Sequence, residues 1–320
     1  MRPVTTVALL TRSHANVAAL RAAAPEDEFI EADPRGPPEA IARAEVALGG
    51  NDPERVRAVL AAAPGLRWYA SVAAGAERLV AAGLVGRPGL AITNNSGAYD
   101  IAIAEHVLAL VFAAAKRLPD YGRAQSRGEW VHELAHSELR GATLVVHGMG
   151  SIGGEVARLG AGLGMRVVGV RRRPGSLPAG VERVVGPEGL AGAAAEADFL
   201  AIAAPLTAAT RGSVSAAVLA RMKPSAWIVN IARGAIVDED ALVAALRGGR
   251  LGGAALDVFS VEPLPREHAL WSLPNVIVTP HAASSSPQVA GRTMAAFLEN
   301  LGRWKRGEPL RNLVDPEAGY

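Results

Sequence analysis

Short apolar runs alternate along this chain with segments in which apolar residues recur at helical spacing. In the first hundred residues the apolar runs predict strands, and the segments between them predict alanine-rich helices. The predicted strands are residues 4–10, 44–48, 66–70 and 90–92, and the predicted helices are residues 15–24, 38–43, 53–63 and 77–82. This alternation is typical of a parallel sheet that helices cover on both faces.

The alternation resumes at residue 143, after a long helix predicted over residues 100–118 and a polar segment over residues 120–139. Further strands are predicted at residues 143–147, 167–170, 199–203, 226–230, 253–256 and 276–278, and further helices at residues 155–163, 215–221, 239–247 and 288–306. The fold class is therefore α/β with doubly wound parallel sheets. A chain of 320 residues is long enough for two such domains.

The amino-acid composition excludes several classes of protein. Lysine and arginine total 33 against 31 acidic residues, an excess too small for the basic stripe that nucleic acid requires. The sequence has no cysteine, which excludes disulfides and thiolate metal sites and fits a reducing compartment. The apolar run at residues 107–115 is too short to cross a bilayer, and residues 1–12 lack the core of a signal peptide. We expect a soluble, cytoplasmic protein that binds neither nucleic acid nor membrane.

One glycine turn carries a pattern with a physical meaning. The strand predicted at residues 143–147 is followed by Gly148-x-Gly150-x-x-Gly153 and then by a helix, the order that a dinucleotide site requires. Gly148 allows a sharp turn, Gly150 leaves room for a pyrophosphate beside the backbone, and Gly153 lets the helix pack closely on the strand. The N–H groups at the start of the helix then face the phosphates. A plain glycine-rich loop is the alternative, which the flanking strand and helix disfavour.

The end of the next predicted strand indicates which dinucleotide is bound. An NAD site usually places Asp or Glu about 20 residues after the first glycine, where the carboxylate accepts hydrogen bonds from the ribose. This chain has Arg171, Arg172 and Arg173 there, and no carboxylate between residues 166 and 180. Guanidinium groups bind a 2′-phosphate through charge-assisted hydrogen bonds and can stack on adenine. We expect NADP(H) in preference to NAD(H), and a solvated basic loop is the alternative.

Three residues at or just beyond predicted strand ends suit the reduction of a 2-oxoacid. Arg233 could bind the substrate carboxylate and polarise the carbonyl, His281 could protonate the forming alkoxide, and Glu262 could fix the histidine tautomer. Strand ends in a parallel sheet share one edge, so the three can meet near the nicotinamide. Taken singly, each also has an ordinary structural interpretation as a loop arginine, a helix cap or salt-bridge partner, and a structural Pro-His.

Two other segments leave alternatives open. The loop after residues 66–70 contains Ala74 and Gly75, whose backbone N–H groups could meet an anion, although an ordinary turn is the simpler interpretation. His132 and His136 stand four residues apart in the polar segment, as a metal-binding pair on a helix would. No further ligand is in view, so we expect no metal and favour a solvated or subunit-contacting arm.

Together these motifs resemble the D-2-hydroxyacid dehydrogenases, in the branch of glyoxylate and hydroxypyruvate reductases. The resemblance extends from about residue 66 to the C-terminus. It is carried by Gly148-Met-Gly-Ser-Ile-Gly153, Pro205-Leu-Thr207 with Thr210, Asn230-Ile-Ala-Arg-Gly234, Leu256-Asp-Val-Phe259 with Glu262-Pro263, and Thr279-Pro-His281. By that resemblance Arg233 binds the substrate carboxylate, Glu262 orients the histidine and His281 is the proton donor.

The resemblance also implies further contacts. Asp257 lies near the nicotinamide, and the backbone of Ala74 and Gly75 completes the carboxylate site. The other cofactor contacts that it implies are Ser151, Ile152, Pro205, Thr210 and Ala232.

The fold that the resemblance implies is a Rossmann cofactor domain inserted into a flavodoxin-like substrate domain. The substrate, or lid, domain would comprise residues 1–97 and 284–320, and the dinucleotide-binding domain residues 98–283. The cleft closes on substrate. The helix from residue 100 and the arm after it would form a homodimer, with Trp130 reaching toward the neighbouring subunit's site.

The expected activity is the NADPH-dependent reduction of a small 2-oxoacid, glyoxylate or hydroxypyruvate, to the D-2-hydroxyacid. A bulkier 2-oxoacid is one alternative, because pocket size depends on side chains around Val72 and Tyr99. A non-enzymatic NAD(P)H-sensing binding protein of the same fold is another. The absence of a regulatory domain after Tyr320 disfavours the long phosphoglycerate dehydrogenases.

Overall fold

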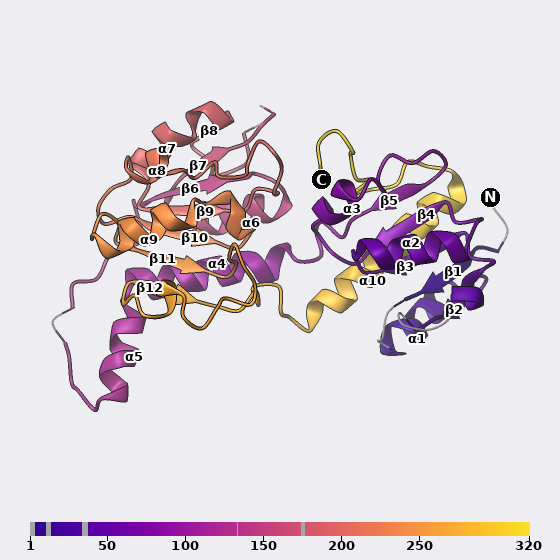
Figure 1. The fold of residues 1–320 in the computed structure, drawn as a ribbon, viewed down its shortest axis with the longest axis horizontal. Helices are drawn as coiled ribbons and strands as arrows, with labels where there is room; N and C mark the ends of the chain where they lie inside the picture. The colour runs from indigo at the N-terminus through magenta and orange to yellow at the C-terminus, as the bar shows by residue number, and fades with distance from the viewer. Residues whose placement is uncertain (1–3, 11–13, 34–37, 133, 174–176) are drawn as a thin grey trace. The chain divides into compact units, whose positions relative to one another are not determined.

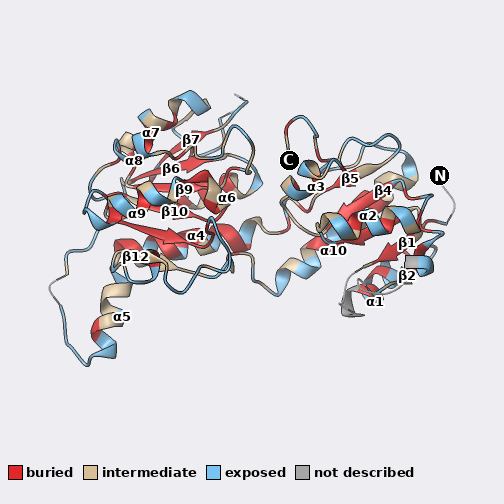
Figure 2. Cartoon of the chain, in the orientation of Figure 1, coloured by how far each residue is buried: buried red, intermediate tan, exposed pale blue. Residues whose placement is uncertain are grey.

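The computed structural model describes residues 4–10, 14–33, 38–132, 134–173 and 177–320. The chain folds into two compact units (Figure 1). Unit 1 comprises Met1–Tyr99 and Ser286–Tyr320, and unit 2 comprises Asp100–Ser285. Each unit is built around one parallel sheet, whose central strands are deeply buried (Figure 2).

The sheet of unit 1 has five parallel strands in the order β2-β1-β3-β4-β5. This is the flavodoxin-like order of a doubly wound sheet. The strands are β1 (Thr6–Leu9), β2 (Glu28–Glu31), β3 (Val46–Gly49), β4 (Trp68–Ser71) and β5 (Ala91–Thr93).

Helices cover both faces of this sheet, because alternate residues of each buried strand carry apolar side chains to opposite faces. One face packs against α2 (Pro53–Ala62), α3 (Glu77–Ala81) and the 3₁₀ turn η1 (Pro38–Ile41). The other packs against α1 (His14–Ala23) and α10 (Gln288–Arg306). Trp68 of β4 stacks on Phe297 of α10 with ring centroids 5.3 Å apart, so the last helix belongs to the core of unit 1.

The sheet of unit 2 has seven parallel strands in the order β12-β11-β10-β9-β6-β7-β8. Numbered from β6, this is the Rossmann order, and its direction reverses between β6 and β9. The strands are β6 (Thr143–His147), β7 (Arg166–Val170), β8 (Arg183–Val185), β9 (Phe199–Ile202), β10 (Trp227–Asn230), β11 (Gly253–Leu256) and β12 (Val276–Val278).

Helices also flank both faces of the second sheet. On one face lie α7 (Leu190–Glu196), α8 (Ala216–Leu219) and α9 (Glu239–Arg247), and on the other lie α4 (Asp100–Ala115) and α6 (Ser151–Gly162). The helix α5 (Leu118–Ser126) follows α4, and η2 (Pro187–Gly189), η3 (Gly234–Ile236) and η4 (Ala269–Trp271) are short 3₁₀ turns. None of the helices in the described ranges is both long enough and apolar enough to cross a membrane.

The predicted fold class is confirmed, with some differences in the elements. The strands β2 and β8 were not expected, nor was α7. Both strands lie at sheet edges and contain charged residues, so their apolar pattern is weak. The helix predicted over residues 100–118 ends at Ala115, and α5 begins after Arg117, which has a left-handed backbone (φ 54°).

Candidate active site

The glycine turn lies where the strand order of unit 2 reverses, and two of its glycines are required by packing. Gly148 has a φ of 103°, and a Cβ there would lie 2.3 Å from the backbone nitrogen of Ala204, just beyond β9. A Cβ on Gly153 would lie 1.9 Å from the carbonyl oxygen of Gly148. Neither position can hold a side chain without moving the backbone.

Gly150 has no such packing reason. Its φ of −83° suits any residue, and a Cβ there would meet nothing within 4 Å. Gly150 is the N-cap of α6 and supplies no side chain to cap the first N–H groups of the helix, which begin at Ser151 and Ile152. A helix start of this kind is suited to an anion such as a pyrophosphate.

The arginine run lies beside this turn. The N–H of Gly148 donates to the carbonyl of Val170, the last residue of β7, at 2.9 Å. Arg171 follows at once, is half-buried, and donates its N–H to Val185 of β8 at 3.1 Å, whereas Arg172 and Arg173 are exposed. The arginine run therefore begins at the edge of the glycine turn, on the side where the ribose of a dinucleotide lies in this kind of fold.

The loop after β9 is closed by its own side chains. The Thr210 hydroxyl donates to the carbonyl of Pro205 at 2.6 Å and accepts from the N–H of Thr207 at 2.8 Å. Because Gly148 touches the backbone of Ala204, this loop and the glycine turn form adjoining walls of one region. The Thr210 hydroxyl shapes the loop through these bonds.

His281 and Glu262 form a direct pair. Nδ1 of the histidine lies 2.7 Å from Oε2 of the carboxylate, and Oε1 of Glu262 accepts the N–H of Phe259 at 3.0 Å. The carboxylate therefore favours a proton on Nδ1. Nε2 of His281 makes no hydrogen bond to any residue that the structure describes, so it is the nitrogen that can exchange a proton with a ligand.

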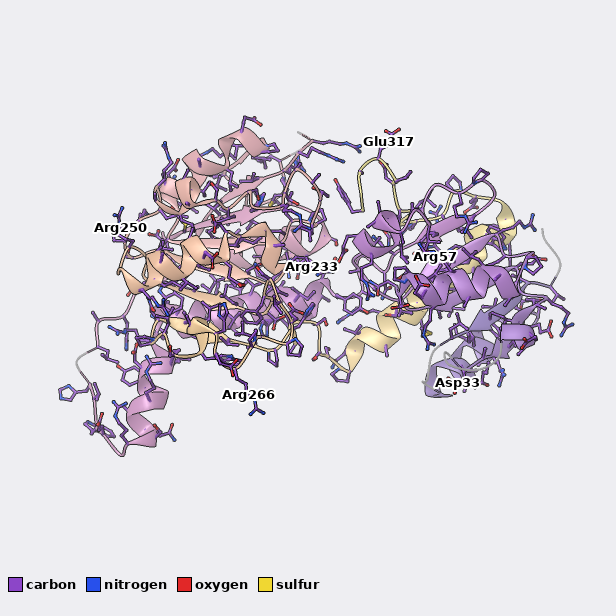
Figure 3. The ribbon with its side chains drawn as sticks, viewed as in Figure 1. Asp33, Arg57, Arg233, Arg250, Arg266 and Glu317 are labelled. Carbon is purple, nitrogen blue, oxygen red and sulfur yellow. The ribbon has the colours of Figure 1, made fainter. Side chains whose placement is uncertain are left out.

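Arg233 lies on a turn after β10 that a buried asparagine shapes (Figure 3). Oδ1 of Asn230 accepts the N–H of Ala232 at 3.1 Å, and its Nδ2 donates to the carbonyl of Arg233 at 3.0 Å. A Cβ on Gly234 would lie 2.0 Å from the carbonyl carbon of Phe259. The arginine turn thus lies directly against the turn that carries Glu262.

Asp257 is buried directly after β11 and holds the loop that carries His281. One carboxylate oxygen accepts the Thr279 hydroxyl at 2.6 Å and the N–H of Ala282 at 2.8 Å, and the other accepts the N–H of Ala283 at 3.0 Å. The carbonyl of Asp257 accepts the N–H of His281 at 2.8 Å. The structure therefore brings Asp257, Glu262, His281 and the Arg233 turn to one edge of the unit 2 sheet.

In unit 1, side chains hold the carbonyl groups of the loop after β4. The carbonyl of Val72 accepts from the Tyr99 hydroxyl at 2.5 Å and from Nδ2 of Asn95 at 3.1 Å. The carbonyl of Gly75 accepts from Nδ2 of Asn51 at 3.1 Å. These bonds fix the direction in which the peptide groups of the loop face.

The N–H groups of the same loop remain available. Neither Ala74 nor Gly75 donates its N–H to any part of the chain that the structure describes, and both residues are half-buried. Two neighbouring N–H groups of this kind are typical of a backbone anion site. This arrangement favours the anion interpretation of the loop over that of an ordinary turn.

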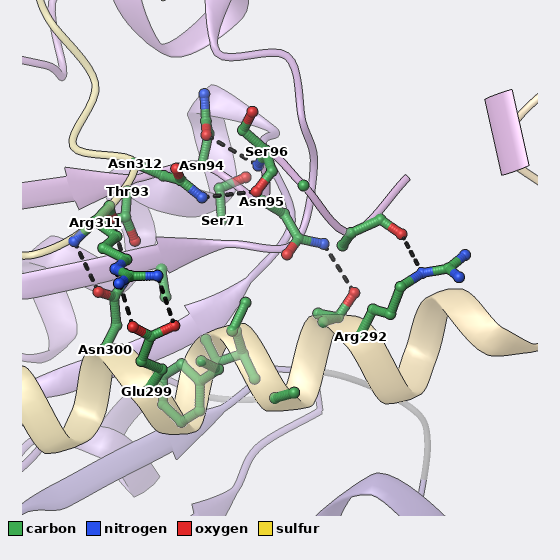
Figure 4. A pocket seen from close by; sticks show the side chains of 18 of the residues that line it. Ser71, Thr93, Asn94, Asn95, Ser96, Arg292, Glu299, Asn300, Arg311 and Asn312 are labelled. Carbon is green, nitrogen blue, oxygen red and sulfur yellow. Dashed lines mark hydrogen bonds and ion pairs between the residues drawn. The ribbon is translucent and has the colours of Figure 1, made fainter. Parts of the chain in front are cut away.

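Unit 1 also contains a cavity of about 400 Å³ between β4, β5 and α10 (Figure 4). Its polar groups bond to one another: Asn95 donates to the Thr293 hydroxyl at 2.8 Å, and Nε of Arg292 donates to the carbonyl of Ala98 at 2.7 Å (Figure 4). Neither Ala74 nor Gly75 lines it. The cavity lies where α10 packs beside β4 and β5, and it is not part of the candidate active site.

The described residues of the polar arm after α5 include no group of metal ligands. Nε2 of His136 lies 2.9 Å from the Tyr121 hydroxyl, and no three His, Asp or Glu side chains come together as metal ligands anywhere in the described ranges. Trp130 is 92% exposed, and Ile101 and Phe112 of α4 are exposed as well.

His147, the last residue of β6, is a buried titratable group beside the glycine turn. Its Nε2 lies 3.0 Å from the Ser213 hydroxyl, and its Nδ1 has no partner among the described residues. Burial lowers the pKa of His147 to about 4, so the ring is neutral near pH 7.

Several residues that shape the site were given no role from the sequence, although Asn230, Gly234 and Thr279 lie in motifs that carry the resemblance. Asn230 and Gly234 position the arginine turn, Thr279 bonds Asp257, and Asn51 holds the loop of unit 1. Only Asn230 carried a usable signal, because a buried amide directly at a strand end needs a partner. The other contacts join segments far apart in the sequence.

Unit 2 is thus constructed as nicotinamide-dependent dehydrogenases are, with a Rossmann sheet, a glycine turn at its switch point and ionisable side chains at the ends of neighbouring strands. Comparison with known proteins narrows this class. The family described as D-isomer specific 2-hydroxyacid dehydrogenase, NAD binding domain, matches residues 108–283, and the chain belongs to this family. It is therefore an oxidoreductase of the D-2-hydroxyacid dehydrogenase type with a nicotinamide cofactor.

Among the relatives, a glyoxylate reductase from Korarchaeum cryptofilum is 38% identical over 268 residues, covering 81% of this chain and 79% of that protein. A glyoxylate/hydroxypyruvate reductase B from Yersinia enterocolitica is 33% identical over 269 residues, covering 82% and 81%.

Solved structures agree with the fold. A D-isomer specific 2-hydroxyacid dehydrogenase from Xanthobacter autotrophicus Py2, in complex with NADPH and MES, has a TM-score of 0.87 at 34% identity and covers all of both chains. An NADPH-dependent glyoxylate/hydroxypyruvate reductase from Sinorhizobium meliloti, in complex with NADP and sulfate, has a TM-score of 0.84 at 29% identity and covers 99% of this chain and 100% of that one.

Proposed function

We propose that this protein catalyses the NADPH-dependent reduction of a small 2-oxoacid, glyoxylate or hydroxypyruvate, to the D-2-hydroxyacid. The observation that carries the proposal is the pair formed by Nδ1 of His281 and Oε2 of Glu262, 2.7 Å apart. This pair places the Nδ1 proton of His281 at the carboxylate and would leave Nε2 to face the substrate.

Each residue of the proposed centre has one task. Arg233 binds the substrate carboxylate and polarises the adjacent carbonyl. When bound, the nicotinamide cofactor supplies the hydride that adds to the carbonyl carbon. His281 gives its Nε2 proton to the carbonyl oxygen as that oxygen becomes an alkoxide, and Glu262 holds the ring through both states. The neutral histidine then regains a proton from solvent.

The proposed preference for NADP(H) rests on Arg171, Arg172 and Arg173. Their position beside the glycine turn suits a 2′-phosphate, and the two similar solved structures described above were determined with NADPH or NADP. The pyrophosphate would be held by Gly148, Gly150 and Gly153 with the N–H groups of Ser151 and Ile152. The remaining proposed cofactor contacts are Pro205, Thr210, Ala232 and Asp257.

The proposed substrate contacts in unit 1 are the N–H groups of Ala74 and Gly75. They suit a carboxylate because they are adjacent and have no other acceptor among the described residues. Unit 1 would then serve as the substrate domain and unit 2 as the dinucleotide-binding domain. Relatives named for glyoxylate and hydroxypyruvate favour a small acid.

We also propose a cytoplasmic homodimer. The exposed apolar side chains Ile101 and Phe112 of α4 and Trp130 of the following arm would be covered by a second copy of the chain. A measured molar mass of one chain at micromolar concentration would exclude the dimer.

The test is the loss of nicotinamide absorbance with the purified protein. NADPH and NADH are each assayed with glyoxylate, hydroxypyruvate, pyruvate and a phenyl-substituted 2-oxoacid. We expect turnover of glyoxylate and hydroxypyruvate with NADPH. Their kcat/KM with NADPH should be at least about tenfold higher than with NADH, because one charge-assisted contact is worth more than about 1 kcal/mol.

A matched variant separates the two parts of the proposal. Arg171→Asp with Arg172→Pro should shift the preference toward NADH while glyoxylate remains a substrate. An unchanged preference would contradict the role of the arginines. Turnover of the phenyl-substituted acid alone would contradict the substrate class, and NADPH binding without any turnover would indicate a sensing protein instead.

A further inference from the structure

His106, on α4, lies beside Thr279 and Asp257, the two side chains that hold the loop of His281. Its Nε2 lies 3.2 Å from the Thr279 hydroxyl and 3.8 Å from Oδ1 of Asp257. The side chain is 23% exposed, so it is largely enclosed. None of the steps proposed above uses this histidine.

The donors and acceptors in this contact can be assigned. The Thr279 hydroxyl has one proton, and it donates that proton to the Asp257 carboxylate at 2.6 Å, because a carboxylate can only accept. The hydroxyl oxygen must then accept from His106, which requires a proton on Nε2 of His106. The three side chains therefore form one directed chain of hydrogen bonds from His106 through Thr279 to Asp257.

Asp257 in turn holds the loop that carries His281. Its carbonyl and carboxylate oxygens accept the N–H groups of His281, Ala282 and Ala283 at 2.8 to 3.0 Å. His281 itself has a left-handed backbone with a φ of 53°. A residue other than glycine holds such a conformation only where its surroundings fix it.

We propose that His106 is a positioning residue for His281 and acts through Thr279 and Asp257. By holding Thr279 at the carboxylate, His106 keeps the loop in the conformation in which Nδ1 of His281 meets Glu262. The proposal rests on the proposed function in one respect, because it takes His281 as the proton donor.

The test compares two substitutions of the same residue. His106→Leu keeps the volume and removes the donor, so kcat with NADPH and glyoxylate should fall about fivefold to tenfold, the value of one hydrogen bond. The dissociation constant of NADPH, measured by cofactor fluorescence, and the melting temperature should stay near those of the unaltered protein. His106→Gln restores a donor at similar reach and should recover most of the lost kcat.

A double substitution tests whether His106 acts through Thr279. Thr279→Val removes the hydroxyl through which His106 acts, so adding His106→Leu to Thr279→Val should change kcat no further. Additive losses would overturn the proposal, because they would show that His106 acts elsewhere. The proposal would also be overturned if His106→Leu and His106→Gln both lowered kcat, NADPH affinity and melting temperature to a similar extent. Such losses would indicate a structural role alone.

Two controls complete the experiment. Glu105→Gln changes the exposed neighbour of His106 on the same helix and should leave kcat unchanged. His281→Ala, assayed in parallel, tests the proposed function by itself. If His281→Ala is inactive but His106→Leu is unimpaired, only the positioning role fails; if His281→Ala retains full turnover, the proposed function fails.

Discussion

The glycine turn at residues 148–153 and the histidine loop at residues 279–283 both follow strands of the unit 2 sheet, but different forces fix them. The turn is shaped by the absence of side chains, since Gly148 and Gly153 let backbone groups approach where a Cβ could not fit. The loop is shaped by one buried side chain, since Asp257 accepts the hydroxyl of Thr279 and the N–H groups of Ala282 and Ala283.

This difference determines whether a substitution in each segment first affects stability or turnover. Gly148 and Gly153 pack closely on backbone groups and leave no room for a side chain, so a substitution at either position disturbs the fold of the turn. A loop made by hydrogen bonds can lose one of them and stay folded, because each bond contributes only about 1 kcal/mol. Changes at Gly148 or Gly153 should therefore appear first in stability, and changes around the loop should appear first in turnover.

The largest expected effect is that of Gly153→Ala. Within a helix this substitution would ordinarily stabilise a protein by up to about 1 kcal/mol. Here the new Cβ would lie 1.9 Å from the carbonyl oxygen of Gly148, so we expect a net loss of more than about 3 kcal/mol in the free energy of unfolding. Urea unfolding at pH 7 measures it.

Gly150→Ala is the matched control in the same turn. Its Cβ would meet nothing within 4 Å, so the free energy of unfolding should be retained, whereas the dissociation constant of NADPH should rise at least about tenfold. Comparable stability losses in the two variants would contradict the distinction between a packing glycine and a ligand-binding glycine.

A smaller effect is expected where β6 enters the turn, at His147. Burial lowers the pKa of this histidine from 6.5 to about 4, so between these pH values the unfolded chain binds a proton that the folded protein does not. Stability should fall as the pH drops from about 6.5 to 4, by up to about 3 kcal/mol, and level off below pH 4.

The measurement is urea unfolding of the unaltered protein and of His147→Gln across this pH range. The difference between the two should decline from pH 6.5 to pH 4, because only the unaltered protein carries the buried histidine. A difference that is independent of pH would show that His147 is protonated as easily in the folded protein as in the unfolded chain.

Much of the fold of both units could be predicted from the sequence. The strands at Gly253–Leu256 and Val276–Val278 and the helices at Glu239–Arg247 and Gln288–Arg306 have the predicted bounds. Buried parallel strands are continuous apolar runs, and these helices have a strong apolar face, so local pattern was enough. The pairing of Glu262 with His281 was expected from their places near strand ends and from the family resemblance.

What could not be predicted depends on contacts between distant segments. The contact between His106 and Thr279 joins residues 173 positions apart, and neither the apolar helix around His106 nor the Thr279-Pro-His281 motif indicates the other residue. The Asn51 bond to Gly75 is of the same kind. The edge strands β2 and β8 were missed because pairing with a neighbouring strand, and not their own apolar pattern, defines them.

The central claim of this account is that His281, held by Glu262, protonates the substrate. The most direct test is the turnover of glyoxylate by His281→Ala, with the dissociation constant of NADPH measured on the same preparation. We expect kcat to fall by at least about 10²-fold, the usual contribution of general acid catalysis, with the NADPH dissociation constant changed less than about twofold. A variant that retains the full kcat would contradict the assignment.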